Sequence, residues 1–132
     1  MAGQLTIDTL KASTGVLATQ NGMTGIAKAW VNYNGTTQTV NNSFNISSVT
    51  RNSAGDYTLN FATAMANANY TVAFGIGSQG TNDCRGTALI KTTVATSAPS
   101  LMTTTQLEFI TGATHTTGIS DWYTITATVF GS

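Results

Sequence analysis

Apolar side chains recur at every second position along much of this chain, and this spacing constrains the fold more than any other feature. In the stretch DYTLNFAT, Tyr57, Leu59 and Phe61 fall on one face of an extended strand, and NYTVAFGI (69–76) repeats the pattern. A period of two residues is typical of a strand with one buried face, whereas a helix needs apolar residues three and four apart. The side chains expected in the core are Trp30, Phe44, Ile46, Tyr57, Leu59, Phe61, Val72 and Phe74.

Short segments with a strand pattern are separated by clusters of glycine, asparagine and serine. They are residues 26–33, 36–40, 43–49, 56–63, 69–76, 87–95, 101–111 and 122–130. About eight short strands at this spacing predict an all-β fold, an antiparallel, jelly-roll-like β-sandwich over residues 26–132. Asn34-Gly35 predicts a type I′ hairpin turn, and residues 51–56 predict a longer one. The alanine-rich residues 62–69 are short for a helix, so we expect a loop there.

Residues 1–25 lack the turn-bounded strand pattern of the rest of the chain. Leu5 and Ile7 alternate before a segment of small residues. We expect an extended N-terminal arm that becomes ordered against another chain, with Leu5, Ile7 and Leu10 as its candidate anchor. A disordered tail is the alternative interpretation.

The charge content excludes several classes of partner. Charged residues make up 8% of the 132 residues, and five Lys and Arg balance five Asp and Glu. This balance leaves no basic surface for nucleic acid or for an anionic membrane. No apolar run approaches the roughly 18 residues of a membrane span, and the first residues lack the pattern of an export signal. The chain is long enough for one domain, and its single cysteine, Cys84, excludes an intrachain disulfide.

One glycine motif, FGIGSQG (74–80), has the G-x-G-x-x-G spacing of a dinucleotide-binding turn. Such a turn needs a helix directly after it, because the helix N-terminus binds the pyrophosphate. The residues that follow are turn formers and then β-branched residues, and no acid occurs between Asp83 and Glu108. We therefore interpret the motif as a loop between two strands and expect no cofactor.

Residues able to carry catalysis are few. His115 is the single histidine, and neither a G-x-S-x-G motif nor the spacing to Cys84 supports a nucleophile beside it. The acids available to a glycosidase are Asp8, Asp56, Asp83, Glu108 and Asp121. Asp56 and Asp121 stand at strand starts, where an acid usually shapes a turn. We expect no catalytic residue and no metal site, since one cysteine and one histidine are too few for zinc.

The first half of the expected sandwich region has a recognisable pattern. The matching stretches are AKAWVNYNG (27–35), SFNISSVT (43–50), GDYTLNF (55–61), Met65, Asn69-Tyr70 and the closing VFG (129–131). Together they resemble a module of structural proteins from tailed bacteriophages, especially phages of cyanobacteria and other aquatic bacteria. In those proteins the module forms the distal part of tail fibres and of collar or other virion appendages. The likeness is specific over residues 27–76 and weaker over 78–120.

The resemblance implies a virion structural protein without enzymatic activity. It implies a homotrimer, made in the host bacterial cytoplasm and displayed on the outside of the particle. Residues 1–25 would then contact other virion proteins or the other subunits, and the exposed surface would serve adsorption to a host glycan or protein. Long shafts often precede the module in fibre chains, so about 25 residues before it favour a short appendage.

The loops are the expected place of host contact, because residues 77–86 and 111–120 fall where such modules vary. The candidate contact residues are Ser78, Gln79, Asn82, Asp83, Arg85, Thr114, His115 and Thr116. A capsid decoration or neck protein that stabilises the particle is the alternative function. A carbohydrate-binding module or a small glycan-active enzyme is a third.

Overall fold

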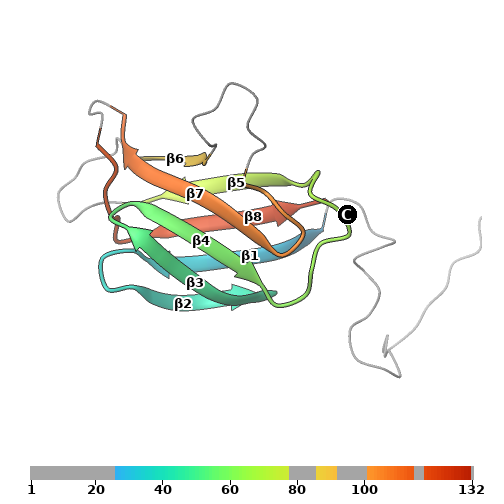
Figure 1. Cartoon of the computed structure of the whole chain (residues 1–132). Helices are drawn as coiled ribbons and strands as arrows, with labels where there is room; N and C mark the ends of the chain where they lie inside the picture. The colour runs from blue at the N-terminus through green and yellow to red at the C-terminus, as the bar shows by residue number, and fades with distance from the viewer. Residues whose placement is uncertain (1–25, 78–85, 92–100, 115–117, 132) are drawn as a thin grey trace, which may run out of the picture.

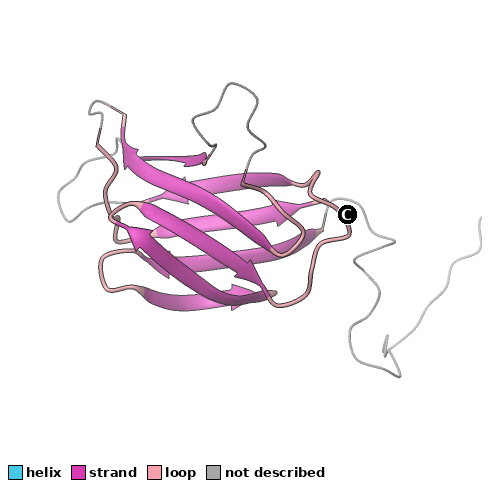
Figure 2. Cartoon of the chain, in the orientation of Figure 1, coloured by secondary structure: helices cyan, strands magenta, loops and turns pink. Residues whose placement is uncertain are grey.

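The computed structural model describes residues 26–77, 86–91, 101–114 and 118–131. These residues form two four-stranded sheets that lie face to face, as Figure 1 shows. All the strand pairs within the sheets are antiparallel, and the described residues contain strands and loops but no helix (Figure 2). The predicted all-β sandwich is therefore confirmed.

Each sheet combines strands from both halves of the chain. The strands are β1 (Ala27–Asn34), β2 (Thr39–Phe44), β3 (Ile46–Ser53), β4 (Asp56–Phe61), β5 (Thr71–Ile76), β6 (Gly86–Ile90), β7 (Gln106–Ala113) and β8 (Ile125–Phe130). The first sheet has the order β2-β1-β8-β5, and the second has the order β3-β4-β7-β6. The chain crosses between the sheets after β2, β4, β5 and β7, so the strands of both halves close one core.

The core lies between the two sheets and follows the alternation of the strands. Along β8, Ile125, Ala127 and Val129 are buried while the residues between them are partly exposed. The buried apolar set is Ala29, Val31, Tyr33, Tyr57, Leu59, Phe61, Met65, Tyr70, Leu107, Phe109, Trp122, Ile125, Ala127 and Val129. Burial of one large apolar side chain in such a core stabilises the fold by about 1.5 to 3 kcal/mol. Three predicted core residues, Ile46, Val72 and Phe74, are partly buried and pack against this set.

Trp30 does not belong to the core, contrary to the prediction. On β1 the buried apolar positions are Ala29, Val31 and Tyr33, and Trp30 lies between them on the opposite face of the strand. Side chains on a strand alternate between its two faces, so the burial of those three residues on the inner face places Trp30 on the outer face. The large indole is therefore directed to the outside of the first sheet.

Phe44 is the second correction, because its side chain is 45% exposed. The sequence pattern placed Phe44 and Ile46 on one face of a single strand. The chain instead bends at Asn45, which has a φ of 54° and separates β2 from β3. The Asn45 amide donates to the carbonyl oxygen of Lys28 at 3.0 Å, which fixes the bend. Phe44 consequently stays on the outside of the first sheet, while Ile46 enters the second sheet and packs inward.

The turn after β1 also differs from the predicted type I′ turn. Four residues, 35–38, connect β1 to β2, and among them Gln38 has a positive φ of 57°. The Asn34 side-chain oxygen accepts the backbone N–H groups of Thr36 and Thr37, each at 3.0 Å. Asparagine thus shapes this turn through its side chain. Gly35 is required for space, because a Cβ there would meet the Tyr57 hydroxyl and Ile125.

Two other sequence expectations concern residues outside the sheets. Residues 62–69 form a loop, as predicted from their short alanine-rich pattern. The expected arm, residues 1–25 with its anchor Leu5, Ile7 and Leu10, lies outside the described residues.

Candidate functional site

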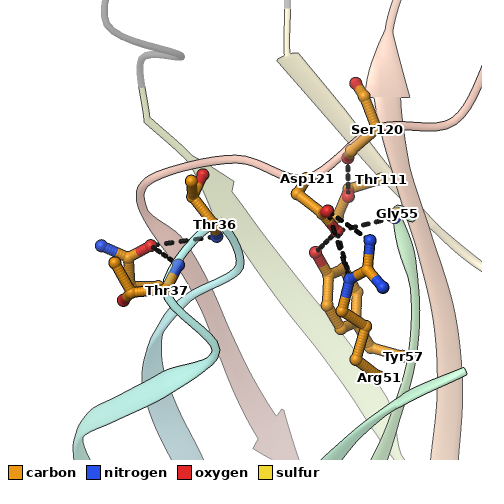
Figure 3. A network of polar contacts seen from close by, with 9 residues as sticks. Thr36, Thr37, Arg51, Gly55, Tyr57, Thr111, Ser120 and Asp121 are labelled. Carbon is orange, nitrogen blue, oxygen red and sulfur yellow. Dashed lines mark hydrogen bonds and ion pairs between the residues drawn. The ribbon is translucent and has the colours of Figure 1, made fainter. Parts of the chain in front are cut away.

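A partly buried polar cluster joins the two sheets at one end of the sandwich, and Figure 3 shows it from close by. Its centre is the carboxylate of Asp121, in the segment that leads into β8. The Arg51 guanidinium donates to both carboxylate oxygens, with Nη2 to Oδ2 at 2.7 Å and Nε to Oδ1 at 3.1 Å. The Gly55 N–H donates to Oδ1 at 2.9 Å, and the Tyr57 hydroxyl donates to the same oxygen. Asp121 therefore ties the β3–β4 hairpin to the start of β8.

The charge of Asp121 is stabilised by these donors. Burial alone would raise the pKa of this carboxyl, but the hydrogen bonds from Arg51, Tyr57 and Gly55 outweigh it and lower the pKa to about 2. The same burial, together with the hydrogen bond to Asp121, raises the pKa of Tyr57 well above its ordinary value. At neutral pH the cluster is thus an anion held by a cation and by two uncharged donors.

The ring of Tyr57 belongs to the core at the same time. It stacks on Phe109 with ring centroids 5.4 Å apart and meets Tyr33 edge-on at 5.5 Å. Next to it, Gly55 has a φ of 70°, and an added Cβ would lie 2.6 Å from the Thr111 carbonyl oxygen. The residues around Asp121 are therefore fixed by packing as well as by hydrogen bonds.

A second ionic cluster lies on the outer face of the second sheet. Lys91 follows β6, and its ammonium lies 2.7 Å from an oxygen of Asp56 on β4 and 3.4 Å from an oxygen of Glu108 on β7. Burial would raise the pKa of Asp56, but the hydrogen bonds from Lys91 and Asn52 lower it. The hydrogen bond to Asp56 raises the pKa of Lys91. This arrangement pins three neighbouring strands together.

These contacts decide what the acids can do chemically. Acid–base hydrolysis of a glycoside needs one carboxyl that holds a proton near neutral pH, which requires a raised pKa. The pKa values of Asp56 and Asp121 are both lowered by cationic partners. In the described ranges no group of three His, Cys, Asp or Glu side chains could hold a metal ion. The geometry of both acids favours a structural role.

A small hollow opens beside the second cluster, at the β6–β7 edge of the second sheet. It has a volume of about 180 Å³ and is lined by Thr87, Leu89, Ile110, Thr111, Gly112, Ala113, Gly118 and Ile119. Ligand pockets usually measure about 300 to 1,000 Å³ and offer several convergent polar groups. This hollow is smaller and largely apolar, so it accommodates one apolar side chain better than a whole ligand.

The outer face of the first sheet is different, and we call it the neutral face. Its outward residues, grouped by the strands β2, β1, β8 and β5, are Asn42, Phe44, Trp30, Asn32, Thr126, Thr128, Phe130, Thr71, Ala73 and Gly75. The four strands contain a single charged residue, Lys28, which is 4% exposed. Aromatic, amide and hydroxyl side chains thus share one sheet face without any exposed charge.

Most of the predicted contact residues cannot be compared with this geometry. Ser78, Gln79, Asn82, Asp83, Arg85, His115 and Thr116 lie outside the described residues, as does Cys84. Thr114 is exposed, directly after β7. Gly75 lies on β5 and Gly77 directly after it, and an added Cβ would meet Thr126 of β8 or Thr124 just before that strand, respectively. Close packing against these threonines accounts for both glycines.

Sequence reasoning missed the pairing of Arg51 with Asp121 and the position of Trp122. Seventy residues separate Arg51 from Asp121 along the chain, and no local pattern links them. Trp122 is completely buried, and its indole Nε1 has no hydrogen-bond partner among the residues that the structure describes. A usable signal existed for the neutral face, since the phase of Val31 and Tyr33 directs Trp30 and Asn32 outward.

Comparison of the chain with protein-family models, with curated proteins and with solved structures finds no match. Among the described residues no helix is long and apolar enough to cross a membrane.

Proposed function

We propose that this chain is a structural protein of a tailed-bacteriophage virion, a short trimeric fibre or appendage that takes part in adsorption to the host surface. The observation that carries the proposal is the resemblance of residues 27–76 to the phage appendage module. Those residues form β1 to β5, more than half of the strands of the sandwich. The proposal includes no catalytic step.

The positions of the matching residues support this reading. Gly55 and Asp56 close the β3–β4 turn, and Tyr57, Leu59 and Phe61 are buried in the core. Residues at such positions maintain the fold and take no part in a reaction, as expected of a module with a structural role.

The cationic partners of the described Asp and Glu side chains support a role without catalysis. Lys91 contacts both Asp56 and Glu108, and Arg51 binds Asp121 through two nitrogen atoms. Asp56 and Asp121 are therefore each matched by a cation that lowers the pKa of the carboxyl and stabilises its charged form. A carboxyl that remains ionised cannot donate a proton to a leaving group at neutral pH.

Particle purification tests the virion role. We expect the chain to band with intact particles of the phage that encodes it and to be labelled on their surface by immunogold electron microscopy. Labels at the tail or neck would agree with adsorption, and an even cover over the head would replace adsorption by capsid decoration. A chain that is abundant in the lysate but absent from washed particles would contradict the virion role.

Light scattering tests the expected subunit number. A trimer should elute with about three times the 13.7 kDa mass of the single chain. A monomer at micromolar concentration would contradict the trimeric assembly without deciding the virion role.

A further inference from the structure

Two large aromatic side chains, Trp30 and Phe44, lie beside smaller side chains on the neutral face. We call this pair the aromatic ridge. Phe44 lies on the edge strand β2 and is paired across the ladder with Trp30 on β1. The same row continues through Thr128 on β8 to Ala73 on β5. In this row two large rings therefore stand at one side of the face, and small side chains follow at the other; the Phe130 ring lies in a neighbouring row, on β8. A flat ring-shaped ligand can lie on such a surface with one face against the aromatic side chains.

The next row supplies hydrogen-bonding groups in set orientations. The Asn32 side-chain oxygen accepts from the Asn41 amide at 3.0 Å, and the Asn42 side-chain oxygen accepts from the Ser43 N–H at 2.9 Å. With the oxygens used in this way, the amide NH₂ groups of Asn32 and Asn42 are available as donors. Thr126 donates its hydroxyl hydrogen to a β5 carbonyl oxygen at 3.3 Å, so its hydroxyl oxygen can accept.

The absence of exposed charge selects the class of ligand. An acidic polymer, a phosphate or an anionic lipid surface would need lysine or arginine side chains. The charged residue of these strands, Lys28, is buried. A ligand that offers C–H surfaces to the rings and hydroxyl groups to the amides, without charge of its own, fits the face.

The dimensions favour a small ligand over a second copy of the chain. Four strands spaced by about 4.8 Å and about six residues long, at about 3.3 Å per residue, span roughly 400 Å² in plan. A stable protein interface buries about 800 Å² on each partner. In plan the neutral face is smaller than such an interface, whereas the ridge and the amide row suit a short oligosaccharide.

We propose that the neutral face binds a neutral oligosaccharide. A pyranose ring lies against Trp30 and Phe44 with its C–H groups toward the rings, and its hydroxyl groups bond Asn32 and Asn42. The biological meaning of this inference rests on the adsorption role proposed above. The inference places host contact on a sheet face in addition to the loops. Its test uses the purified chain, so it can fail while the virion role stands.

Binding is tested with an array of neutral hexasaccharides of glucose, galactose and mannose, printed beside oligomers of uronic acids. The full chain should bind at least one neutral probe and none of the acidic ones. Titration of that probe should change the emission of Trp30, because the indole lies in the proposed site. Absence of saturable binding to every neutral probe up to about 10 mM would overturn the proposal.

Matched variants place the binding on the neutral face. Trp30→Ala and Phe44→Ala should each weaken binding about tenfold or more, since they remove a stacking surface. Tyr123→Ala is the control, because Tyr123 is an aromatic residue of nearly equal exposure, 44% against 45% for Phe44, outside the neutral face. Phe44 is an exposed residue of an edge strand, so its variant remains informative if Trp30→Ala fails to fold. Equal losses in the control, or no loss in Phe44→Ala, would overturn the proposal.

Light scattering of the same variants tests whether part of this protein, rather than a sugar, covers the neutral face. If Trp30→Ala or Phe44→Ala dissociates an oligomer and leaves sugar binding intact, a second copy covers the face and the proposal is wrong. If deletion of residues 1–25 is needed before any probe binds, the chain's own N-terminal segment covers the face, which also overturns the proposal for the full chain.

Discussion

The two outer faces of the sandwich have similar strands but opposite electrostatic character. The second sheet carries Asp56, Lys91 and Glu108 in one cluster, and Arg51 at its end binds Asp121. The first sheet exposes no charge and presents aromatic and amide side chains instead. Charges that already neutralise one another contribute to stability and have little left for a ligand, whereas outward-facing rings and amide NH₂ groups contribute little to stability and remain available. The comparison therefore separates the face that holds the fold together from the face that can bind.

The two tryptophans give the largest expected contrast between core and outer surface. Trp122→Ala should lower the free energy of unfolding by about 3 to 5 kcal/mol, because it leaves a cavity in a fully buried site. Urea denaturation followed by circular dichroism measures this change. Trp30→Ala, measured in parallel, should cost much less. Equal losses for the two variants would contradict the outward position of Trp30.

Removal of Asp121 should have the next largest effect. Asp121→Ala leaves the Arg51 guanidinium, the Gly55 N–H and the Tyr57 hydroxyl without their common acceptor. We expect a loss of about 2 to 3 kcal/mol, less than for a fully buried pair, because both side chains keep some contact with water. Thermal unfolding measures the loss, and the variant should bind sugar as the parent does at temperatures where it is folded. A stable variant with altered sugar binding would reverse the roles assigned to the two faces.

Acid should weaken the fold through the same carboxylate. The pKa of Asp121 is about 2 in the folded chain, below its ordinary value of 3.8, so the unfolded state binds the proton more readily. The stabilisation is complete above about pH 4 to 5 and is lost as the pH falls through 2, which amounts to about 1 to 2 kcal/mol. Unfolding free energies of the parent and of Asp121→Asn across this range measure it. Parallel acid profiles for the two proteins would show that Asp121 is not the responsible group.

Truncation of the exposed ring on the neutral face should have the smallest effect on stability. Phe44→Ala removes a side chain that is 45% exposed at a sheet edge, so we expect a change below about 1 kcal/mol. Thermal unfolding measures it. A large loss would mean that Phe44 packs against something other than this sandwich, such as another subunit.

The period-two pattern was sufficient to predict the fold class because it depends on each strand alone. Tyr57, Leu59 and Phe61 are buried as their spacing predicted. The assignment failed at Phe44 because a single backbone conformation at Asn45 moves the chain from one sheet to the other. Propensity does not reveal such a bend, since asparagine adopts positive φ only at some of its positions.

The candidate sites depended on information that local sequence lacks. Arg51 and Asp121 meet because β4 and β7 pair and bring the ends of distant segments together. The neutral face arises from the order β2-β1-β8-β5, which places Phe44 beside Trp30 and Asn42 beside Asn32. Alternation along β1 directs Trp30 and Asn32 outward, but strand order is set by the packing of the whole core, so their neighbours on the face could be named only once the sheets were known.

Acrylamide quenching of the two tryptophans tests the division between the faces most directly. Trp122→Phe leaves Trp30 as the only fluorophore of this type, and Trp30→Phe leaves Trp122. The account predicts that Trp30 emits at longer wavelength and is quenched readily, while Trp122 is shielded. A shielded Trp30 in the folded chain would contradict an open neutral face, and with it the separation of a stabilising face from a binding face.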